Sequence, residues 1–406
     1  MATTSLPSSR PPGRYCTPRR RTLFLAFILG ALSLLLPDVL WAFPQPAPVD
    51  VQHSATDSSM EKTLMHRALD LEREAGFDVP ARLYQAVDEA LAQAERVLPE
   101  RTSQAYRALG QRKAAKLLRE VDRSLQALCP TRANASDGLI STALREGACD
   151  CDIYVVFYLS LAERTGLPLQ SVLAPRHMML RWEGECAAFF WETTSAMTRD
   201  EAFYRDWLQP AEASVAGGYY LRPLTGTEMT GYLYFLRGTR QHYLGQTEAA
   251  RRDLEHALDL YPKLPNARHV LATAYAEQGN HAHAIRLFTE VLDMDPYFTK
   301  TLYRRASSYY VNRQYTQALA DYDRYLALEG PDADALVGRG QALQAQGPTF
   351  YNAAMTAYNQ ALDLDDWAGV RVSRGSLHLL RENHRRAIKD FSKAIKLNDA
   401  QHQVYL

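Results

Sequence analysis

The sequence has no excess of charge of either sign. Lys plus Arg and Asp plus Glu each number 46 among its 406 residues, so no overall field attracts nucleic acid or anionic lipid. We therefore expect no nucleic-acid partner. A chain of this length has room for two or three domains, and a hydrophobic content of 47% is enough to fill folded cores.

Cysteine is also scarce, with five residues in the chain. Cys16 precedes an apolar segment, which leaves Cys129, Cys149, Cys151 and Cys186 in the rest of the sequence. An oxidising compartment permits disulfides among these four, and Cys149 has two candidate partners, Cys129 and Cys186. Cys149, Cys151 and His177 could alternatively contribute to a zinc site, but no Cys-x-x-Cys or His-x-x-x-His completes the ligand set, so we expect no metal and no cofactor.

Residues 1–42 predict a targeting segment. Three arginines at 19–21 precede an apolar stretch, residues 22–42, whose single charge is Asp38. A basic flank, an apolar core and a small residue at its end are typical of a cleaved secretory signal, while the stretch is also long enough to anchor the chain in a bilayer. We expect an exported protein, periplasmic or secreted, joined to this segment by a flexible Pro/Ser-rich linker at 43–60.

Residues 61–230 are expected to form one folded region. Apolar residues three or four apart up to Leu128 predict amphipathic helices that brace the segment after them. A buried helix is predicted over 152–164, with Asp150 as its N-cap and Gly166 at its C-terminal end.

Two short apolar runs, HMMLRW and CAAFFWE, predict a β-hairpin. A two-residue turn of Gly184 and Glu185 would place His177 directly opposite Glu192, with Cβ atoms about 4.5 to 5.5 Å apart. Cys186 would lie beside the turn, about 20 Å from His177. The hairpin thus brings an imidazole and a carboxylate within hydrogen-bonding reach.

Cys151 is the candidate nucleophile beside this pair. It falls in the first turn of the expected helix, where free N–H groups and the helix dipole favour a thiolate, whereas the charges of Asp150 and Asp152 oppose it. A histidine oriented by a carboxylate acts as a base toward such a thiol. Cys149 is the alternative nucleophile.

The spacing of these residues resembles the transglutaminase-like superfamily over roughly residues 146–195. Tyr154 follows Cys151 by three residues, and Gly166 opens a Gly-Leu-Pro motif fifteen residues after it. The stretch PRHMMLRW resembles the family's histidine motif, and FFWETTS resembles its acid motif, with Glu192 in place of the usual aspartate. PRHMMLR is also similar to bacterial invasion-regulator-like proteins, a branch that joins such a core to tetratricopeptide repeats.

The resemblance implies an α+β papain-like core in which Cys151 is the nucleophile, His177 the base and Glu192 the orienting group. The implied chemistry is acyl transfer, either hydrolysis of an amide or peptide or transfer to an amine, through an acyl-enzyme. The alternative is a catalytically inactive core in a protein-interaction scaffold. A free thiol of low pKa at Cys151 would favour the enzyme.

Residues 231–406 predict five tetratricopeptide repeats. The ends of the second helices fall at Pro262, Pro296, Gly330, Asp366 and Asp399, in steps of 34, 34, 36 and 33 residues. A period of 34 is that of the tetratricopeptide helix pair. This part of the chain is therefore expected to be an all-α superhelix.

Stacked helix pairs form a concave groove, which predicts a protein or peptide ligand. Five residues on first helices are candidates either for the groove or for packing between helices: Tyr234, Arg237, Tyr303, Arg304 and Arg374. The array could alternatively serve as a rigid brace for the core.

Overall fold

The computed structural model describes residues 62–99, 102–126, 128–132 and 139–403. The expected targeting segment at 1–42 and most of the residues before the first helix lie outside this part of the chain. Within the described ranges, no helix has the length and apolar content needed to cross a membrane.

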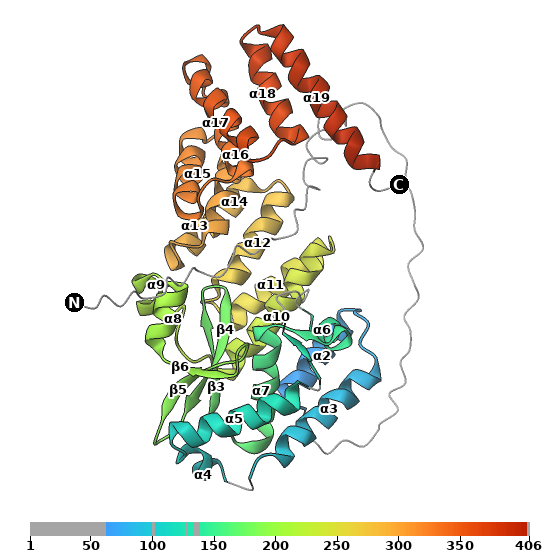
Figure 1. Cartoon of the computed structure of the whole chain (residues 1–406), viewed down its shortest axis with the longest axis vertical. Coiled ribbons are helices and arrows are strands. Elements are labelled where there is room, and N and C mark those ends of the chain that lie inside the picture. The colour runs from blue at the N-terminus through green and yellow to red at the C-terminus, as the bar shows by residue number, and fades with distance from the viewer. Residues whose placement is uncertain (1–61, 100–101, 127, 133–138, 404–406) are drawn as a thin grey trace, which may run out of the picture. The chain divides into compact units, whose positions relative to one another are not determined.

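Helices dominate the chain ahead of the candidate nucleophile (Figure 1). They are α2 (Leu64–Glu74), α3 (Ala81–Arg96), α4 (Ser103–Arg107), α5 (Gln111–Leu125) and α6 (Ile140–Glu146). In α3 the side chains of Leu83, Val87 and Leu91 are almost wholly buried, as their spacing predicts. The expected amphipathic helices are therefore present, and their apolar faces supply part of the main core.

Helix α7 (Cys151–Thr165) is the buried helix predicted from the sequence. Asp150 caps its N-terminus by accepting a hydrogen bond from the backbone N–H of Ile153 at 3.3 Å. Gly166 ends the helix with φ of +73°, a left-handed conformation that glycine adopts without strain. Both ends of α7 were therefore correctly predicted, and Cys151 is its first residue.

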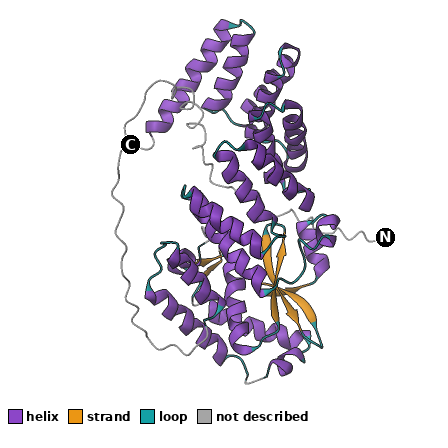
Figure 2. Cartoon of the chain, turned by 180° about the vertical axis from the view of Figure 1, so that it is seen from behind, coloured by secondary structure: helices purple, strands orange, loops and turns teal. Residues whose placement is uncertain are grey.

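A four-stranded antiparallel sheet, seen in orange in Figure 2, packs against α7. Its strands, in spatial order, are β3 (Leu169–Ala174), β4 (His177–Glu183), β5 (Ala188–Glu192) and β6 (Met197–Arg199). A second, small sheet pairs β1 (Thr131–Arg132) in parallel with β2 (Ala148–Cys149). The sequence predicted the β4–β5 hairpin but neither of the flanking strands.

The register of the hairpin differs from the prediction. Glu183 pairs with Ala188, so the connection spans residues 184–187 rather than the two residues Gly184 and Glu185. The backbone N–H of Glu185 donates to the carbonyl of Arg107 at the end of α4, at 2.7 Å. This contact with a distant helix holds the longer loop. Because the shift is two residues and side chains alternate with a period of two, every residue keeps its predicted face.

Two further helices, α8 (Glu201–Leu208) and α9 (Glu212–Ala216), come after the sheet. Asp200 caps α8 by accepting from the backbone N–H of Phe203 at 2.8 Å. Tyr204, in the middle of α8, is completely buried. Helix α8 therefore packs firmly against the sheet, and this brings it beside His177.

The remaining chain consists of antiparallel helix pairs with the expected spacing. The pairs are α10 (Gly226–Tyr243) with α11 (Thr247–Leu260), α12 (Pro265–Glu277) with α13 (His281–Met294), α14 (Thr299–Val311) with α15 (Tyr315–Glu329), α16 (Ala333–Ala345) with α17 (Tyr351–Leu364), and α18 (Ala368–Leu380) with α19 (His384–Gln403). The first helix begins at Gly226, a few residues before the expected boundary at 231. A short 3-10 helix at Pro348–Phe350 accommodates the longer step between repeats.

Buried ion pairs join the two helices of alternate repeats. Arginine on the first helix and aspartate sixteen residues later on the second form these pairs: Arg237 with Asp253 at 2.6 Å, Arg305 with Asp321 at 2.7 Å, and Arg374 with Asp390 at 2.8 Å. In the second repeat the same two positions hold Leu271 and Leu287, which are apolar. The repeats therefore share a backbone arrangement but hold it by different chemistry.

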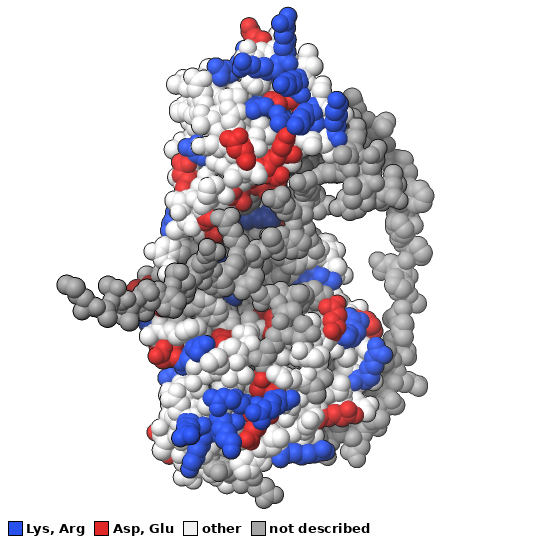
Figure 3. Space-filling model, viewed as in Figure 1, with Lys and Arg blue, Asp and Glu red and all other residues white. Residues whose placement is uncertain are grey.

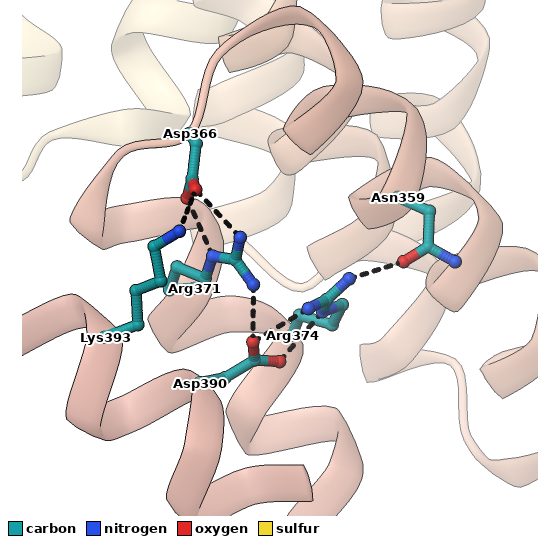
Figure 4. A network of polar contacts seen from close by, with 6 residues as sticks. All are labelled: Asn359, Asp366, Arg371, Arg374, Asp390 and Lys393. Atoms are coloured by element: carbon teal, nitrogen blue, oxygen red, sulfur yellow. Dashed lines mark hydrogen bonds and ion pairs between the residues drawn. The ribbon is translucent and has the colours of Figure 1, made fainter.

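The last of these pairs belongs to a larger network, shown in Figure 4. Arg371 bonds to both Asp366 and Asp390, at 2.7 and 2.9 Å, and Arg374 also donates to the side chain of Asn359 at 2.8 Å. Lys393 adds a second cation to Asp366. The network ties α17, α18 and α19 together.

The first repeat is fastened to the helices and sheet before it. Arg237 on α10 donates to the backbone carbonyl of Leu71 on α2. Tyr220, just before α10, donates its hydroxyl to Asp295 at the end of α13, at 2.9 Å. A single core cluster accordingly runs from α2 through the sheet to α12. The junction is therefore packed, and hydrogen bonds cross it.

Candidate functional site

His177 and Glu192 form a close pair on the outer face of the sheet. Nε2 of His177 lies 2.7 Å from Oε2 of Glu192, and both side chains are less than a tenth exposed. In the observed register Glu192 lies level with Met179, so it reaches His177 diagonally rather than from the opposite position. The predicted contact is present although the predicted pairing was wrong.

Glu192 is held by several donors besides the histidine. Its other oxygen accepts from the backbone N–H and the hydroxyl of Thr194, at 3.0 and 2.6 Å. Tyr204 donates its hydroxyl to Oε2 at 3.0 Å. Burial would raise the pKa of Glu192, but His177 and the two donors of Thr194 outweigh it and lower the pKa to about 2. The carboxylate is therefore charged and fixed in orientation.

Aromatic rings from α8 close one side of His177. The ring of Trp207 meets the imidazole edge-on at 5.2 Å, and that of Tyr204 stacks at 6.2 Å. Trp207 is itself 41% exposed. These rings restrict the movement of the imidazole.

Cys151 is a free, half-buried thiol at the first position of α7. Its Sγ lies 3.5 Å from Oδ1 of Asp152, to which the S–H donates, and the backbone N–H of Met178 is directed at the sulfur. Met178 follows His177 in β4, so the sulfur lies beside the start of the strand that carries His177. Within the described chain, however, no hydrogen bond joins Cys151 to His177.

The charges around Cys151 favour the thiol over the thiolate. Burial and the carboxylates of Asp152 and Asp150 raise the pKa of Cys151, and the Met178 N–H only partly offsets them. Burial and Asp150 also raise the pKa of Asp152 to about 7. An active enzyme requires a thiol of low pKa, whereas the surroundings of Cys151 in this structure raise its pKa.

A tyrosine from the first repeat reaches this site. Tyr232 on α10 donates its hydroxyl to Oδ2 of Asp152 at 3.0 Å. Tyr232 is buried, and burial together with the nearby carboxylate raises the pKa of its phenol. Asp152 is thus bonded on one side to the thiol of Cys151 and on the other to a helix of the repeat array.

Cys149, the alternative nucleophile, forms a disulfide with Cys129. This pairing selects one of the two partners considered for Cys149. Cys186, the other, is free and exposed in the β4–β5 loop. Of the three cysteines in and around α7 and the hairpin, only Cys151 is both free and close to His177.

No group of three or more His, Cys, Asp or Glu side chains in the described chain is arranged to hold a metal ion.

The first helices of neighbouring repeats bring a set of basic side chains together. Arg304 on α14 lowers the pKa of His242 on α10 and of His269 on α12, in each case adding to the larger effect of burial. Lys300, one turn before Arg304, also acts on His269, whose pKa falls to about 3. His269 also bonds to the hydroxyl of Thr301 at 2.8 Å, and His242 pairs with Glu277 at 3.6 Å. Lys300 and Arg304 are therefore the positively charged members of this set.

The other groove candidates pack between helices. Arg237 and Arg374 form buried ion pairs, Tyr234 packs edge-on against His256 at 4.4 Å, and Tyr303 lies 5.9 Å from Tyr322, ring to ring. Arg304 is the exception, because no carboxylate within the described chain pairs with it.

Sequence reasoning missed Thr194, Tyr204 and Tyr232. Thr194 lies within the FFWETTS motif, so its position two residues after Glu192 was a usable signal. Tyr204 and Tyr232 lie on helices beyond the motifs, at separations of 12 and 80 residues from their partners. No local pattern marks such contacts.

Comparisons with known proteins concern the helix pairs. Residues 235–297 and 303–366 match the tetratricopeptide repeat family. Superkiller complex protein 3 of Mus musculus is 26% identical over 110 residues, which cover 27% of this chain. The chain spans only 7% of the length of that relative.

Among solved structures, MamA from Desulfovibrio magneticus RS-1 is 24% identical, covering 42% of this chain and 96% of its own, with a TM-score of 0.39. YrrB, described as a TPR protein with an unusual peptide-binding site, is 20% identical over 43% of this chain and 91% of its own, with a TM-score of 0.36. Together with the observed helix pairs, the family match shows that the C-terminal part of this chain is an all-helical array of tetratricopeptide repeats.

Proposed function

We propose that this protein is a protein-interaction scaffold, in which the tetratricopeptide array binds a peptide or protein segment. The repeat match at 235–297 and 303–366 carries the proposal, because stacked repeats of this kind present an extended concave surface to partners. The junction through Arg237 and Tyr232 supports a rigid attachment of the array to the preceding helices and sheet.

Lys300 and Arg304 support a ligand with acidic groups. They lie one turn apart on α14, the first helix of the third repeat, and no carboxylate of the described chain pairs with either of them. Arg304 has a planar guanidinium suited to a carboxylate. A partner segment containing Asp or Glu is accordingly the ligand expected in the groove.

Crosslinking of the full-length protein in its native extract, followed by mass spectrometry, would test this proposal. A partner identified in this way would be purified and its affinity measured against Arg304→Ala. We expect a loss of about tenfold, as for a charge pair in a partly buried interface. Arg252→Ala removes a cation from the second helix α11 and should change the affinity little. Crosslinks confined to residues before α10, or equal affinity for both variants, would refute binding through the groove.

A second candidate function is acyl transfer by a transglutaminase-like thiol site, and one observation favours it. The 2.7 Å contact between His177 and a charged, fully bonded Glu192 is the arrangement that orients a catalytic imidazole. Cys151 at the N-terminus of α7, next to the Met178 N–H, supplies the thiol. Hydrogen bonds of such sites are often completed only when substrate binds.

In this reaction the Cys151 sulfur would attack a carboxamide or peptide carbonyl while His177 accepts the thiol proton. His177 would then protonate the leaving amine, and water or another amine would release the acyl group from Cys151. Glu192 would stabilise the imidazolium throughout. Partner binding in the groove and chemistry at Cys151 are compatible, since they use different residues.

The rate of Cys151 alkylation as a function of pH would test the second function. An active site should label rapidly below about pH 8 and lose that reactivity in His177→Ala. Slow labelling with an ordinary or raised thiol pKa, unchanged by His177→Ala and Glu192→Ala, would leave the scaffold as the sole function.

A further inference from the structure

A cavity of about 570 Å³ opens beside the sheet, away from both Cys151 and the groove. Arg181 on β4, Phe190 on β5 and Arg199 on β6 are neighbours across the sheet and line the cavity, together with Phe203 on α8. Arg181 lies on the same face as His177, four residues or about 13 Å along the strand. The volume is in the range that holds a small ligand or a few residues of a peptide.

The buried ring of Tyr204 separates this cavity from the candidate triad. Phe190 and Phe203 both pack edge-on against Tyr204, at 5.3 and 5.2 Å, and the hydroxyl of Tyr204 points the other way, to Glu192. The cavity is therefore a separate site, and a ligand bound in it does not require that either proposed function be correct.

Each of the two arginines lies over a phenylalanine ring. The guanidinium of Arg199 is 4.5 Å from the centre of the Phe203 ring, and that of Arg181 is 5.7 Å from the centre of Phe190. This stacking fixes the plane of each guanidinium and leaves its edge free to donate hydrogen bonds. Arg181 uses its Nε to pair with Glu183.

Arg199 lacks an acceptor for its charge. Within the described residues no carboxylate pairs with it, and the one hydrogen bond of its side chain is a long contact of 3.7 Å to the sulfur of Met197. Its Nε is buried and has no hydrogen-bond partner. The protein therefore compensates the charge of this guanidinium very little, and a ligand carboxylate that bonds to its terminal nitrogens would be favoured.

The acidic residues that line the cavity already bond to other groups of the protein. Asp200 accepts from the backbone N–H of Phe203 at 2.8 Å, and Glu201 pairs with Arg205 at 2.8 Å. Neither carboxylate compensates Arg199. The cavity therefore has an uncompensated positive charge between apolar ring faces.

The surface next to the cavity is basic. Helix α5, whose first residue Gln111 lines the cavity, has five exposed cations: Arg112, Lys113, Lys116, Arg119 and Arg123. In Figure 3 Lys and Arg side chains gather over the part of this face where Figure 1 shows α5. A local field of this kind attracts an extended anion even though the chain as a whole is neutral.

We propose that this cavity binds an acidic segment of a partner protein, with one carboxylate accepting from the two terminal nitrogens of Arg199. The planar fork of Arg199 matches a carboxylate, the Phe190 and Phe203 rings match an apolar side chain beside it, and α5 attracts further acidic residues of the same segment. The mixture of ring faces and a single uncompensated guanidinium fits a peptide better than a bare phosphate, which would be matched by several donors and no rings.

Fluorescence anisotropy with the full-length protein would test this site. The probe is a fluorescein-labelled hexapeptide that alternates glutamate and phenylalanine, and its control replaces each glutamate by glutamine. We expect the glutamate peptide to bind about tenfold more tightly and Arg199→Gln to abolish this difference. Arg82→Gln, an exposed cation on α3 away from the cavity lining, is the matched control and should leave the affinity within about twofold.

Arg199→Lys provides a second variant if Arg199→Gln does not fold, as judged by circular dichroism. It keeps the charge and loses the fork, so binding should weaken about threefold. Inorganic phosphate and vesicles containing anionic lipid are added as competitors. Equal binding of the two peptides, unchanged affinity in both Arg199 variants, or displacement of the peptide by phosphate or vesicles at equal charge concentration would overturn the proposal.

Discussion

The hydroxyl of Tyr232, on the first helix of the repeat array, donates to the carboxylate of Asp152, the residue after Cys151, at 3.0 Å. Asp152 also accepts from the Cys151 thiol. One carboxylate therefore connects the array to the candidate nucleophile, and its protonation state affects both.

Neutralising Asp152 should make Cys151 more reactive. Asp152 is the largest electrostatic cause of the raised pKa of Cys151 after burial, so Asp152→Asn lowers that pKa. We expect alkylation by iodoacetamide at pH 8 to accelerate about three- to tenfold. The measurement is made in a Cys186→Ser background, because Cys186 is exposed and reacts on its own. A rate equal to or below that of the parent would contradict the electrostatic explanation.

The free energy of unfolding should also depend on pH because Asp152 titrates. Its pKa in the folded protein is raised to about 7 from 3.8, so the folded state binds its proton more tightly than the unfolded state. The stabilisation is fully present below about pH 4 and disappears as the pH rises through about 7. Thermal melts between pH 4 and 8 should show this decline, and Asp152→Asn should flatten it. A parent and a variant with parallel profiles would show that another group is responsible.

Glu192 should have the opposite dependence. Its folded pKa of about 2 lies below the ordinary value of 4.5, so its contribution is present above pH 4.5 and is lost as the pH falls toward 2. Glu192→Gln should lower the unfolding free energy at pH 7 by about 1 to 3 kcal/mol and remove this acid sensitivity. Urea unfolding at pH 3 and pH 7 measures both effects. Thr194→Val, which removes one neutral donor, should cost less at pH 7.

Removing Arg237 should destabilise the first repeat strongly. Arg237→Leu leaves Asp253 buried without its partner, at a cost of about 3 to 5 kcal/mol. Adding Asp253→Leu should recover most of that loss, because Leu271 and Leu287 occupy these positions in the second repeat. Urea unfolding of the two variants tests this directly. A double variant as unstable as the single one would mean that the bond to the Leu71 carbonyl is the main contribution of Arg237.

The last repeat should loosen when Asp390 is changed. Asp390 is 2% exposed and bonds to Arg371 and Arg374, and these arginines outweigh burial to lower its pKa. Asp390→Asn should cost about 2 to 4 kcal/mol locally, seen as faster hydrogen exchange in α18 and α19 only. Asp321→Asn is the matched change in the third repeat and should accelerate exchange in α14 and α15 instead. Uniform acceleration throughout the array in either variant would show that the repeats do not loosen independently.

The features that the sequence predicted correctly depend on residues that lie close together in the chain or on a spacing that recurs along it. The ends of α7 were correct because Asp150 and Gly166 act on their own helix, and the repeat array was correct because one spacing recurs along the chain. The faces of the hairpin were also correct, since alternation survives a shift of two residues. The transglutaminase-like assignment of the core goes beyond these signals and is an expectation for experiment.

The features that were missed depend on contacts distant in sequence. The hairpin register is held by the Arg107 carbonyl, and the Cys129–Cys149 disulfide could not be chosen over its alternative without the position of β2 beside β1. The electrostatics of Cys151 likewise depend on how deeply α7 is buried. Sequence supplied the candidate residues, and only the fold showed which of them touch.

The bond between Arg237 and the Leu71 carbonyl spans 166 residues of chain. On a ribosome adding about 5 to 20 residues per second, α2 is made roughly 10 to 30 s before its partner on α10. Helices α3, α6 and α7, which also pack against α2, are made earlier, so the surface still open to water in that interval is the part of α2 that α10 contacts. Helix α10 therefore completes the packing of α2 as well as starting the repeat array.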